Sequence, residues 1–238
     1  MRAFLNLRHS VPERRAAFVK GLERHGYRVV EELCNQPRER DILVSWNLIH
    51  SARHTADVFE SRGLKVLVTE NASWGNDFLG GHWYTLARGR HNTAGRVAYG
   101  GPDRWDRLGY QLSDWRGGSE VLILPQRGIG PPGVAMPHGW AERTQKATGG
   151  RIRQHPGQGA SAPLEQDLTH AKEVRTWGSG AAIKALMWGI PVVSDMPDWI
   201  AEQDNTYAGR IEMFRRLAWA QWTLKEIADG EAFAHVLA

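Results

Sequence analysis

The stretch Trp177-Gly-Ser-Gly-Ala-Ala-Ile-Lys-Ala-Leu-Met-Trp-Gly-Ile-Pro-Val-Val-Ser194 decides the fold. It predicts a loop, a tight helix with one apolar face, and then a buried strand over residues 190–193. Ser179 is the expected N-cap of the helix, and Gly178 and Gly180 allow another group to approach the backbone closely. The N–H groups at the start of such a helix favour anions.

A second stretch, Arg151-Ile-Arg-Gln-His-Pro156, precedes the first by about one structural unit. Side chains alternate between the two faces of an extended chain, so Arg151, Arg153 and His155 are expected on the same side. Cationic and proton-donating groups beside a helix N-terminus suit a diphosphate. We therefore expect sugar-nucleotide chemistry, with an ordinary exposed turn histidine as the alternative interpretation of His155.

The composition indicates a folded globular protein with a slight excess of basic residues. The chain has 238 residues, 42% of them hydrophobic, 11 Trp and a formal net charge of +4. No apolar run approaches the roughly 20 residues needed to cross a bilayer. Cys34 is the only cysteine, which excludes internal disulfides and predicts a reducing cytoplasm, the host cytoplasm if a phage encodes the protein. The basic balance fits a polyanionic partner, and a GC-rich genome would explain it equally well.

Strands alternate with helices along most of the chain, which predicts parallel sheets. In the first half we expect strands over 2–7, 27–31, 41–46 and 64–69, and helices over 11–25, capped by Ser10, and 51–61. After an irregular segment over 71–118, we expect strands over 119–125, 151–154, 174–177 and 190–193, and helices over 140–148, 164–171 and 206–230.

These elements predict an α/β fold of two small Rossmann-like domains and a long C-terminal helix. The expected domains are 1–118 and 119–205, and the helical segment 206–238 is expected to pack back on the first domain.

Several motifs resemble the GT-B class of glycosyltransferases, most closely its capsule-polysaccharide and bacterial sialyltransferase-like groups. The motifs are Arg153-Gln-His-Pro156, the segment from Ser179 to Val192, and Val121-Leu-Ile-Leu-Pro-Gln-Arg-Gly128. Glu70-Asn-Ala-Ser-Trp-Gly75 and the segment from Trp83 to Asn92 look like acceptor-side segments of small phage proteins that modify DNA. The resemblance implies two domains that face each other, the first for the acceptor and the second for a nucleotide-sugar.

The resemblance also implies that His155 contacts the donor phosphate, aided by Arg153 and the helix start at Ser179. The expected donor-binding residues are Gln126, Arg127, Arg151, Arg153, His155, Pro156, Gly178, Ser179 and Gly180. A UDP-sugar is the first expectation for the donor and a CMP-sugar the second. The ten histidines show no metal-ligand spacing, so no protein-bound metal is expected.

Glu70 follows an apolar strand directly, at the edge of the sheet where ligands of open α/β folds collect. It is the first candidate for the general base, Asp77 is the second, and His155 is a further catalytic candidate. An exposed loop carboxylate is the alternative for both acids. The expected acceptor-binding residues are Asn71, Trp74, Trp83, Tyr84, Arg88, Arg90, His91 and Asn92, with a structural loop packed by its own aromatic rings as the alternative.

These observations predict a glycosyltransferase that moves a sugar to a hydroxyl group. The acceptor suggested by the charge and the phage-like segments is a hydroxymethylated pyrimidine in DNA, and a glycan is the alternative. Two other classes stay open. One is a non-catalytic nucleic-acid-binding accessory protein with a degenerate transferase fold, and the other is a phosphosugar isomerase or hydrolase. The oligomeric state stays open as well.

Overall fold

The computed structural model describes residues 1–7, 11–32, 34, 36–49, 51–89, 97–130, 133–155 and 162–238. The chain divides into two compact units, unit 1 (Met1–Gly100 with Ala218–Ala238) and unit 2 (Gly101–Leu217). Residues 101–118 thus lie in unit 2, whereas the expected first domain extended to residue 118. Most of the C-terminal segment belongs to unit 1.

Unit 1 contains a six-stranded sheet in the order β10-β5-β4-β3-β1-β2. The strands β1 (Arg2–Asn6), β2 (Arg28–Val30), β3 (Ile42–Trp46) and β4 (Lys65–Asn71) run parallel, as the sequence predicted. Two further strands, β5 (Trp83–Arg88) and β10 (Gln221–Thr223), extend the sheet in antiparallel fashion. A short 3-10 turn, η1 (Phe78–Gly80), lies between β4 and β5.

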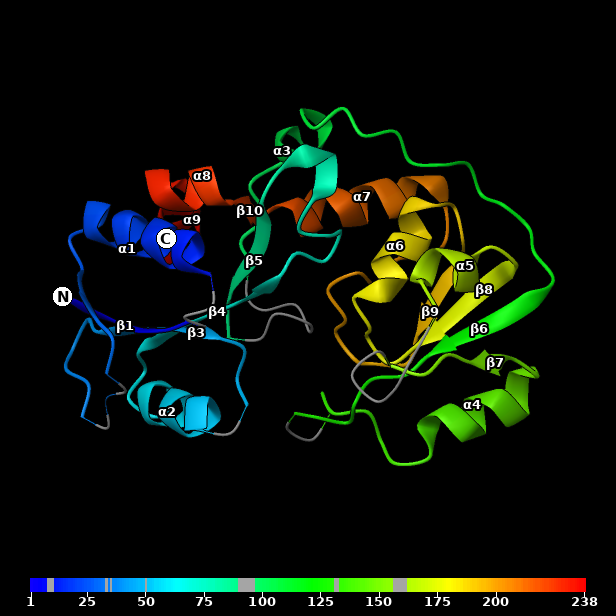
Figure 1. The fold of residues 1–238 in the computed structure, drawn as a ribbon, viewed down its shortest axis with the longest axis horizontal. Coiled ribbons are helices and arrows are strands. Elements are labelled where there is room, and N and C mark those ends of the chain that lie inside the picture. Colours follow the sequence, from blue (N-terminus) through cyan, green and yellow to red (C-terminus); the bar gives the residue numbers. More distant parts are fainter. Residues whose placement is uncertain are drawn as a thin grey trace. The chain divides into compact units, whose positions relative to one another are not determined.

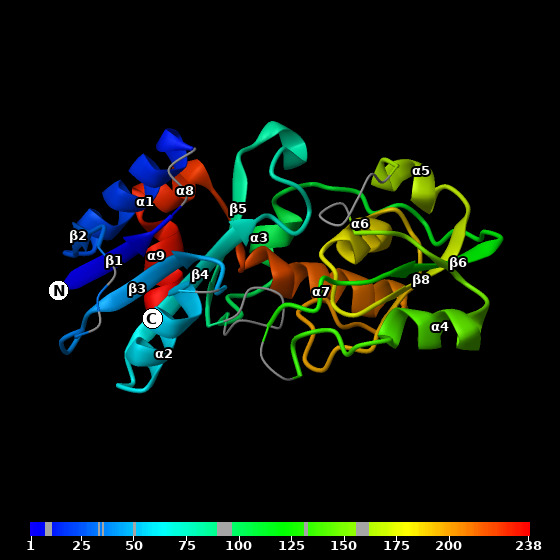
Figure 2. The same ribbon diagram turned by 60° about the horizontal axis from the view of Figure 1, so that its bottom comes forward.

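Helices cover both faces of this sheet (Figures 1 and 2). The helices α1 (Pro12–Arg24), α8 (Leu224–Asp229) and α9 (Glu231–Leu237) lie on one face, and α2 (Ser51–Glu60) lies on the other. The rings of Phe18 and Phe233 pack edge to face on the first side, with centroids 5.9 Å apart. Phe4 and Phe59 pack in the same manner on the second side at 5.7 Å. Burial of these rings holds the helices to the sheet.

Unit 2 contains a four-stranded, fully parallel sheet in the order β7-β6-β8-β9. Its strands are β6 (Glu120–Leu124), β7 (Arg151–Ile152), β8 (Ala171–Thr176) and β9 (Val192–Ser194). In both views α4 (Trp140–Thr148) lies on one face and α5 (Leu164–Leu168) and α6 (Ala181–Met187) lie on the other. Two more helices, α3 (Asp103–Asp106) and α7 (Tyr207–Ala218), precede and follow these elements. The predicted α/β class is confirmed. Parallel strands occur in both sheets, but β5 and β10 make the sheet of unit 1 mixed rather than fully parallel.

The prediction of a single helix over residues 206–230 is wrong. The chain forms α7, β10, α8 and α9 in succession instead. Gln221, Trp222 and Thr223 pair with β5 and bury the Trp222 side chain. Thr223 then starts α8 with a capping box to Glu226, and Gly230 ends it in a left-handed conformation. Long-range strand pairing and local caps therefore outweigh the helical pattern of apolar residues.

Two predicted helix caps differ in detail. Val11 stands at the N-cap of α1 without a side-chain cap, and Ser10 lies outside the described residues. Gly180 stands at the N-cap of α6, one residue after Ser179. The Ser179 hydroxyl still accepts a hydrogen bond from the Ala181 N–H at 3.3 Å, so it serves the first turn from one position further out. None of the helices in the described ranges combines the length and apolar character of a bilayer span.

Candidate functional site

The loops that follow β6, β7 and β8 meet at the carboxyl edge of the unit 2 sheet. These strands are parallel neighbours, so their carboxyl ends lie at one edge of the sheet. Five residues of the predicted donor site follow these ends: Gln126, Arg127, His155, Gly178 and Ser179. Ligands of open α/β sheets bind at this edge, where loops from different strands converge. We call these five residues the strand-end cluster.

Hydrogen bonds fasten the loop after β6 to the loop after β8. The Gln126 side chain donates from Nε2 to the Gly178 carbonyl oxygen at 3.1 Å. The hydroxyl of Thr176 donates to the Leu124 carbonyl oxygen at 3.0 Å and accepts from the Ser179 N–H at 2.9 Å. Both loops are therefore fixed to the sheet before any ligand binds.

Gly178 has no room for a side chain. Its φ of +66° lies in the left-handed region, and a Cβ atom there would lie 2.3 Å from Met196 Cε. Gly180, by contrast, is exposed, and no atom lies within 4 Å of the position that a Cβ would take there. The close neighbour of Gly178 is therefore Met196 of the protein itself, whereas the space beside Gly180 is open. The approach of a ligand to these glycines stays a prediction.

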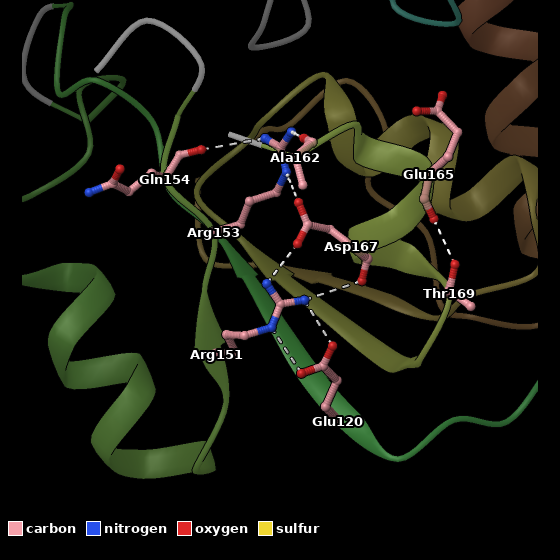
Figure 3. A network of polar contacts seen from close by, with 8 residues as sticks. All are labelled: Glu120, Arg151, Arg153, Gln154, Ala162, Glu165, Asp167 and Thr169. Carbon is pink, nitrogen blue, oxygen red and sulfur yellow. Dashed lines mark hydrogen bonds and ion pairs between the residues drawn. The ribbon is translucent and has the colours of Figure 1, made fainter. Parts of the chain in front are cut away.

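Arg151 and Arg153 point toward the same carboxylate, as strand alternation predicts (Figure 3). Arg151 donates to Asp167 Oδ1 from Nη1 at 2.7 Å, and Arg153 donates to Asp167 Oδ2 from Nε at 2.6 Å. Glu120 holds the other side of Arg151 through two bonds of 3.0 and 2.9 Å. The hydrogen bonds that Arg151 donates to Glu120 and to Asp167 raise its pKa above the ordinary value. Two carboxylates thus engage the charge of Arg151 within the protein.

The electrostatic environment of His155 favours its neutral form. Burial, and next the positive charges of Arg127 and Arg153, lower the pKa of the half-buried imidazole. Arg127 itself is exposed and forms no ion pair with any residue of the described ranges. A phosphate bound here could contact both the His155 imidazole and the Arg127 guanidinium, which pairs with no carboxylate of the described ranges.

In unit 1, Glu70 and Asn71 end β4 at the carboxyl edge of the parallel strands. Glu70 is half-buried, and its Oε1 accepts a hydrogen bond from the Asn71 N–H at 3.2 Å. The amide of Asn76 links this strand end to the next loop, since it donates to Asn71 Oδ1 at 3.0 Å and accepts from the Ala72 N–H at 2.9 Å. Asp77 is exposed at the start of η1. Glu70 is therefore the acid that the sheet itself positions.

The aromatic residues expected to bind the acceptor lie in the core of unit 1. Trp74, Trp83 and Tyr84 are 2%, 6% and 7% exposed, too little to offer a ring face to a base or sugar in this conformation. Trp74 packs on Trp83 and on Phe78, with centroids 5.2 and 5.0 Å away. The structure thus favours the structural interpretation of these rings.

Arg88, a basic residue of the same prediction, does not lie beside Glu70. Arg88 pairs with Leu67 in the sheet, whereas Glu70 pairs with Thr85 near the other end of β5. The cause is the antiparallel direction of β5, which carries Arg88 away from the edge where Glu70 lies. Arg90, His91, Asn92 and the donor-side Pro156 lie outside the described residues.

No protein-family model matches the chain, and no curated protein matches it in sequence. Two solved structures share its architecture. The KpsC β-Kdo 2,4 transferase of Thermosulfurimonas dismutans has a TM-score of 0.57 at 16% identity, covering 92% of this chain and 90% of that one. The KpsC β-Kdo 2,7 transferase of the same organism has a TM-score of 0.52 at 10% identity, covering 98% and 99%.

The chain shares the fold of these two transferases. The likeness supports the glycosyltransferase fold that the His-Pro and Ser-Gly motifs predicted. It extends over more than nine tenths of the chain, so both units are part of it.

Sequence reasoning missed two polar residues that shape these edges. Asp167 joins Arg151 to Arg153, and Arg14 is 3% exposed with its guanidinium carbon 3.9 Å from the Trp46 ring centroid. Neither Asp167 nor Arg14 belongs to a sequence motif. The residues that they contact are distant in the sequence, so no local pattern indicates these contacts. No group of His, Cys, Asp and Glu suited to a metal ion occurs within the part of the chain that the structure describes.

Proposed function

We propose that the protein is a glycosyltransferase that uses a nucleotide-sugar donor. The observation that carries this proposal is the strand-end cluster, in which Arg127, His155 and the loop at Gly178 follow the ends of neighbouring strands, in a chain with the fold of two Kdo transferases. The cluster offers a cation, an imidazole and backbone N–H groups to a phosphate, the set of donors that a departing nucleotide needs.

In the proposed reaction, an acceptor hydroxyl attacks the anomeric carbon while the bond from that carbon to the phosphate oxygen breaks. The negative charge that develops on the phosphate is stabilised by Arg127, by the His155 N–H and by the loop of Gly178, Ser179 and Gly180. Glu70 takes the proton of the acceptor hydroxyl as general base. Asp77 is the second candidate for that role, and its exposed position leaves it less restrained.

Arg151 and Arg153 serve this site indirectly in our proposal. Arg151 is engaged by Glu120 and Asp167, so binding a phosphate would require it to release a carboxylate. Arg153 is 9% exposed and bonded to Asp167. Of the three arginines that the sequence assigned to the donor, we therefore place only Arg127 in direct contact with phosphate, together with Gln126 beside it.

The proposed donor is a CMP-activated sugar acid, ahead of a UDP-sugar. Both similar structures bear the name of Kdo transferases, and Kdo is a keto sugar acid like the sialic acids. The sialyltransferase-like His-Pro element supports the same nucleotide. A hydroxyl on a glycan is the proposed acceptor, because the burial of Trp74, Trp83 and Tyr84 removes the stacking surface expected for a flipped DNA base.

Calorimetric titration with CMP, UDP, GDP and dTDP tests the donor, followed by mass spectrometry of a glycan acceptor and of hydroxymethylated DNA incubated with the matching sugar nucleotide. We expect binding of CMP and a mass increase of one sugar on the glycan. Glycosylated DNA would overturn the proposed acceptor. Duplex binding without affinity for any of the nucleotides would overturn the transferase itself in favour of a nucleic-acid-binding protein. Turnover of a phosphosugar without acceptor would favour an isomerase or hydrolase.

A further inference from the structure

The Arg153 guanidinium contacts the backbone of Gln154 and of Ala162. It donates from Nη2 to the Ala162 carbonyl oxygen at 2.8 Å, and Nη1 lies 3.5 Å from the carbonyl oxygen of Gln154. Gln154 directly precedes His155, and Ala162 stands where the chain returns toward α5 (Figure 3). One planar group thus contacts the residue before His155 and a second backbone position further along the chain.

Asp167 holds that guanidinium in place. Its Oδ2 atom accepts from Arg153 Nε, and its Oδ1 atom accepts from Arg151, which Glu120 fixes from the far side. Asp167 is 9% exposed. Burial alone would raise its pKa, but hydrogen bonds from Arg151 and Arg153 outweigh burial and lower the pKa, so the carboxylate stays charged.

Stability alone does not explain why the remaining bonds of Arg153 go where they do. An ion pair that only fastened β7 to α5 would need one arginine bonded to Asp167. Arg151 already forms that ion pair. The additional bonds of Arg153 reach the carbonyl groups of Gln154 and Ala162, and a buried guanidinium held by several hydrogen bonds has little freedom to move. Its position therefore restrains the backbone that carries the imidazole.

We infer that Asp167 is a positioning residue, whose carboxylate holds Arg153 against these two carbonyl groups and so fixes the His155 imidazole for the donor phosphate. This inference rests on the proposed function for the phosphate, while the geometry of the Asp167–Arg153 pair stands independently of it. Asp167 itself touches no substrate in this role.

The test compares Asp167→Asn with Glu120→Gln. The first substitution weakens the hold on Arg153, and the second removes a carboxylate charge from the same network but leaves Arg153 bonded to Asp167. Three properties are measured: the melting temperature, the affinity for CMP and UDP by calorimetry, and the NMR signals of the His155 imidazole. We expect both variants to melt at lower temperature. Only Asp167→Asn should shift the His155 signals and weaken nucleotide binding, by about tenfold or more.

Equal nucleotide affinity and equal His155 signals in the two variants would overturn the inference. If the wild-type protein binds no nucleotide, the proposed function fails, and the His155 signals still decide whether Asp167 positions the imidazole. Should Asp167→Asn fail to fold, Arg153→Lys replaces it, because lysine keeps the ion pair but cannot bridge two carbonyl groups with a planar fork. The expected result is the same shift of the His155 signals and the same loss of affinity, and wild-type behaviour of Arg153→Lys would contradict it.

Discussion

The Gln126 side chain donates a hydrogen bond to the carbonyl oxygen of Gly178 at 3.1 Å. This bond joins two loops that leave neighbouring strands, and it forms where Gly178 holds a left-handed backbone conformation against Met196. The loop after β8 is thus shaped by contacts within the protein, and the shape exists without a ligand. A loop preorganised in this way loses little freedom when an anion binds.

Gly178→Ala should destabilise the protein, and Gly180→Ala should not. A side chain at position 178 would meet Met196 and would adopt a φ of +66°, which costs about 1–2 kcal/mol in backbone strain. Position 180 has a φ of −60° and open space, so alanine fits there. Thermal unfolding of the two variants measures the difference, and equal melting temperatures would show that the loop is not held as described.

Gly180→Ala also tests where the phosphate of the ligand binds. If a phosphate approaches the backbone at this position, the added methyl group should weaken CMP binding while the melting temperature stays at the wild-type value. Calorimetry on the same preparation gives the affinity. Wild-type affinity in Gly180→Ala would move the phosphate away from this part of the loop.

Arg127→Ala should weaken nucleotide binding without a large loss of stability. Arg127 forms no ion pair within the described ranges, and removal of a charged hydrogen bond to phosphate costs about tenfold in affinity. The effect should shrink at high salt, because salt screens a charge that solvent reaches. Lys146→Ala, which removes an exposed cation on α4, is the matched control. Equal affinities of the two variants would remove Arg127 from the site.

Glu70→Gln should lower the turnover of the transfer reaction by at least about a hundredfold, the usual contribution of a general base. The affinity for the donor nucleotide should stay near the wild-type value, because the proposed role of Glu70 concerns only the acceptor proton. Asp77→Asn serves as the comparison, with turnover expected to remain high. A defect in donor binding alone would assign Glu70 another role, and a large loss in Asp77→Asn would exchange the two acids.

Local pattern predicted the individual elements well. The helix expected over residues 140–148 is α4 with the same bounds, since Gly139 and Gly149 flank it in left-handed conformations that end the regular structure. The strand β6 was predicted because it is a short apolar run bounded by turn residues. The bounds of the two strands beside it differ from the prediction: β7 ends at Ile152 instead of residue 154, and β8 starts at Ala171, where the end of a helix was expected. Alternation along Arg151 and Arg153 placed their side chains on one side, and the bonds to Asp167 confirm this.

The remaining features depend on contacts between distant residues. Strand β10 exists because Trp222 pairs with Tyr84, far away in sequence, and no local pattern in residues 219–223 signals that partner. The antiparallel direction of β5, which separates Arg88 from Glu70, is likewise set by its neighbours in the sheet. The engagement of Arg151 by two carboxylates was hidden for the same reason, so an arginine expected to bind phosphate is found bonded within the protein.

The central claim is that His155 faces the phosphate of a bound nucleotide, and an NMR titration of its imidazole tests this most directly. In the free protein, burial and the charges of Arg127 and Arg153 should place the midpoint below the usual histidine value of about 6.5. Saturating CMP should move the midpoint upward, because the anion favours the protonated ring and offsets both arginines. A midpoint that stays unchanged when the nucleotide is bound would contradict the claim.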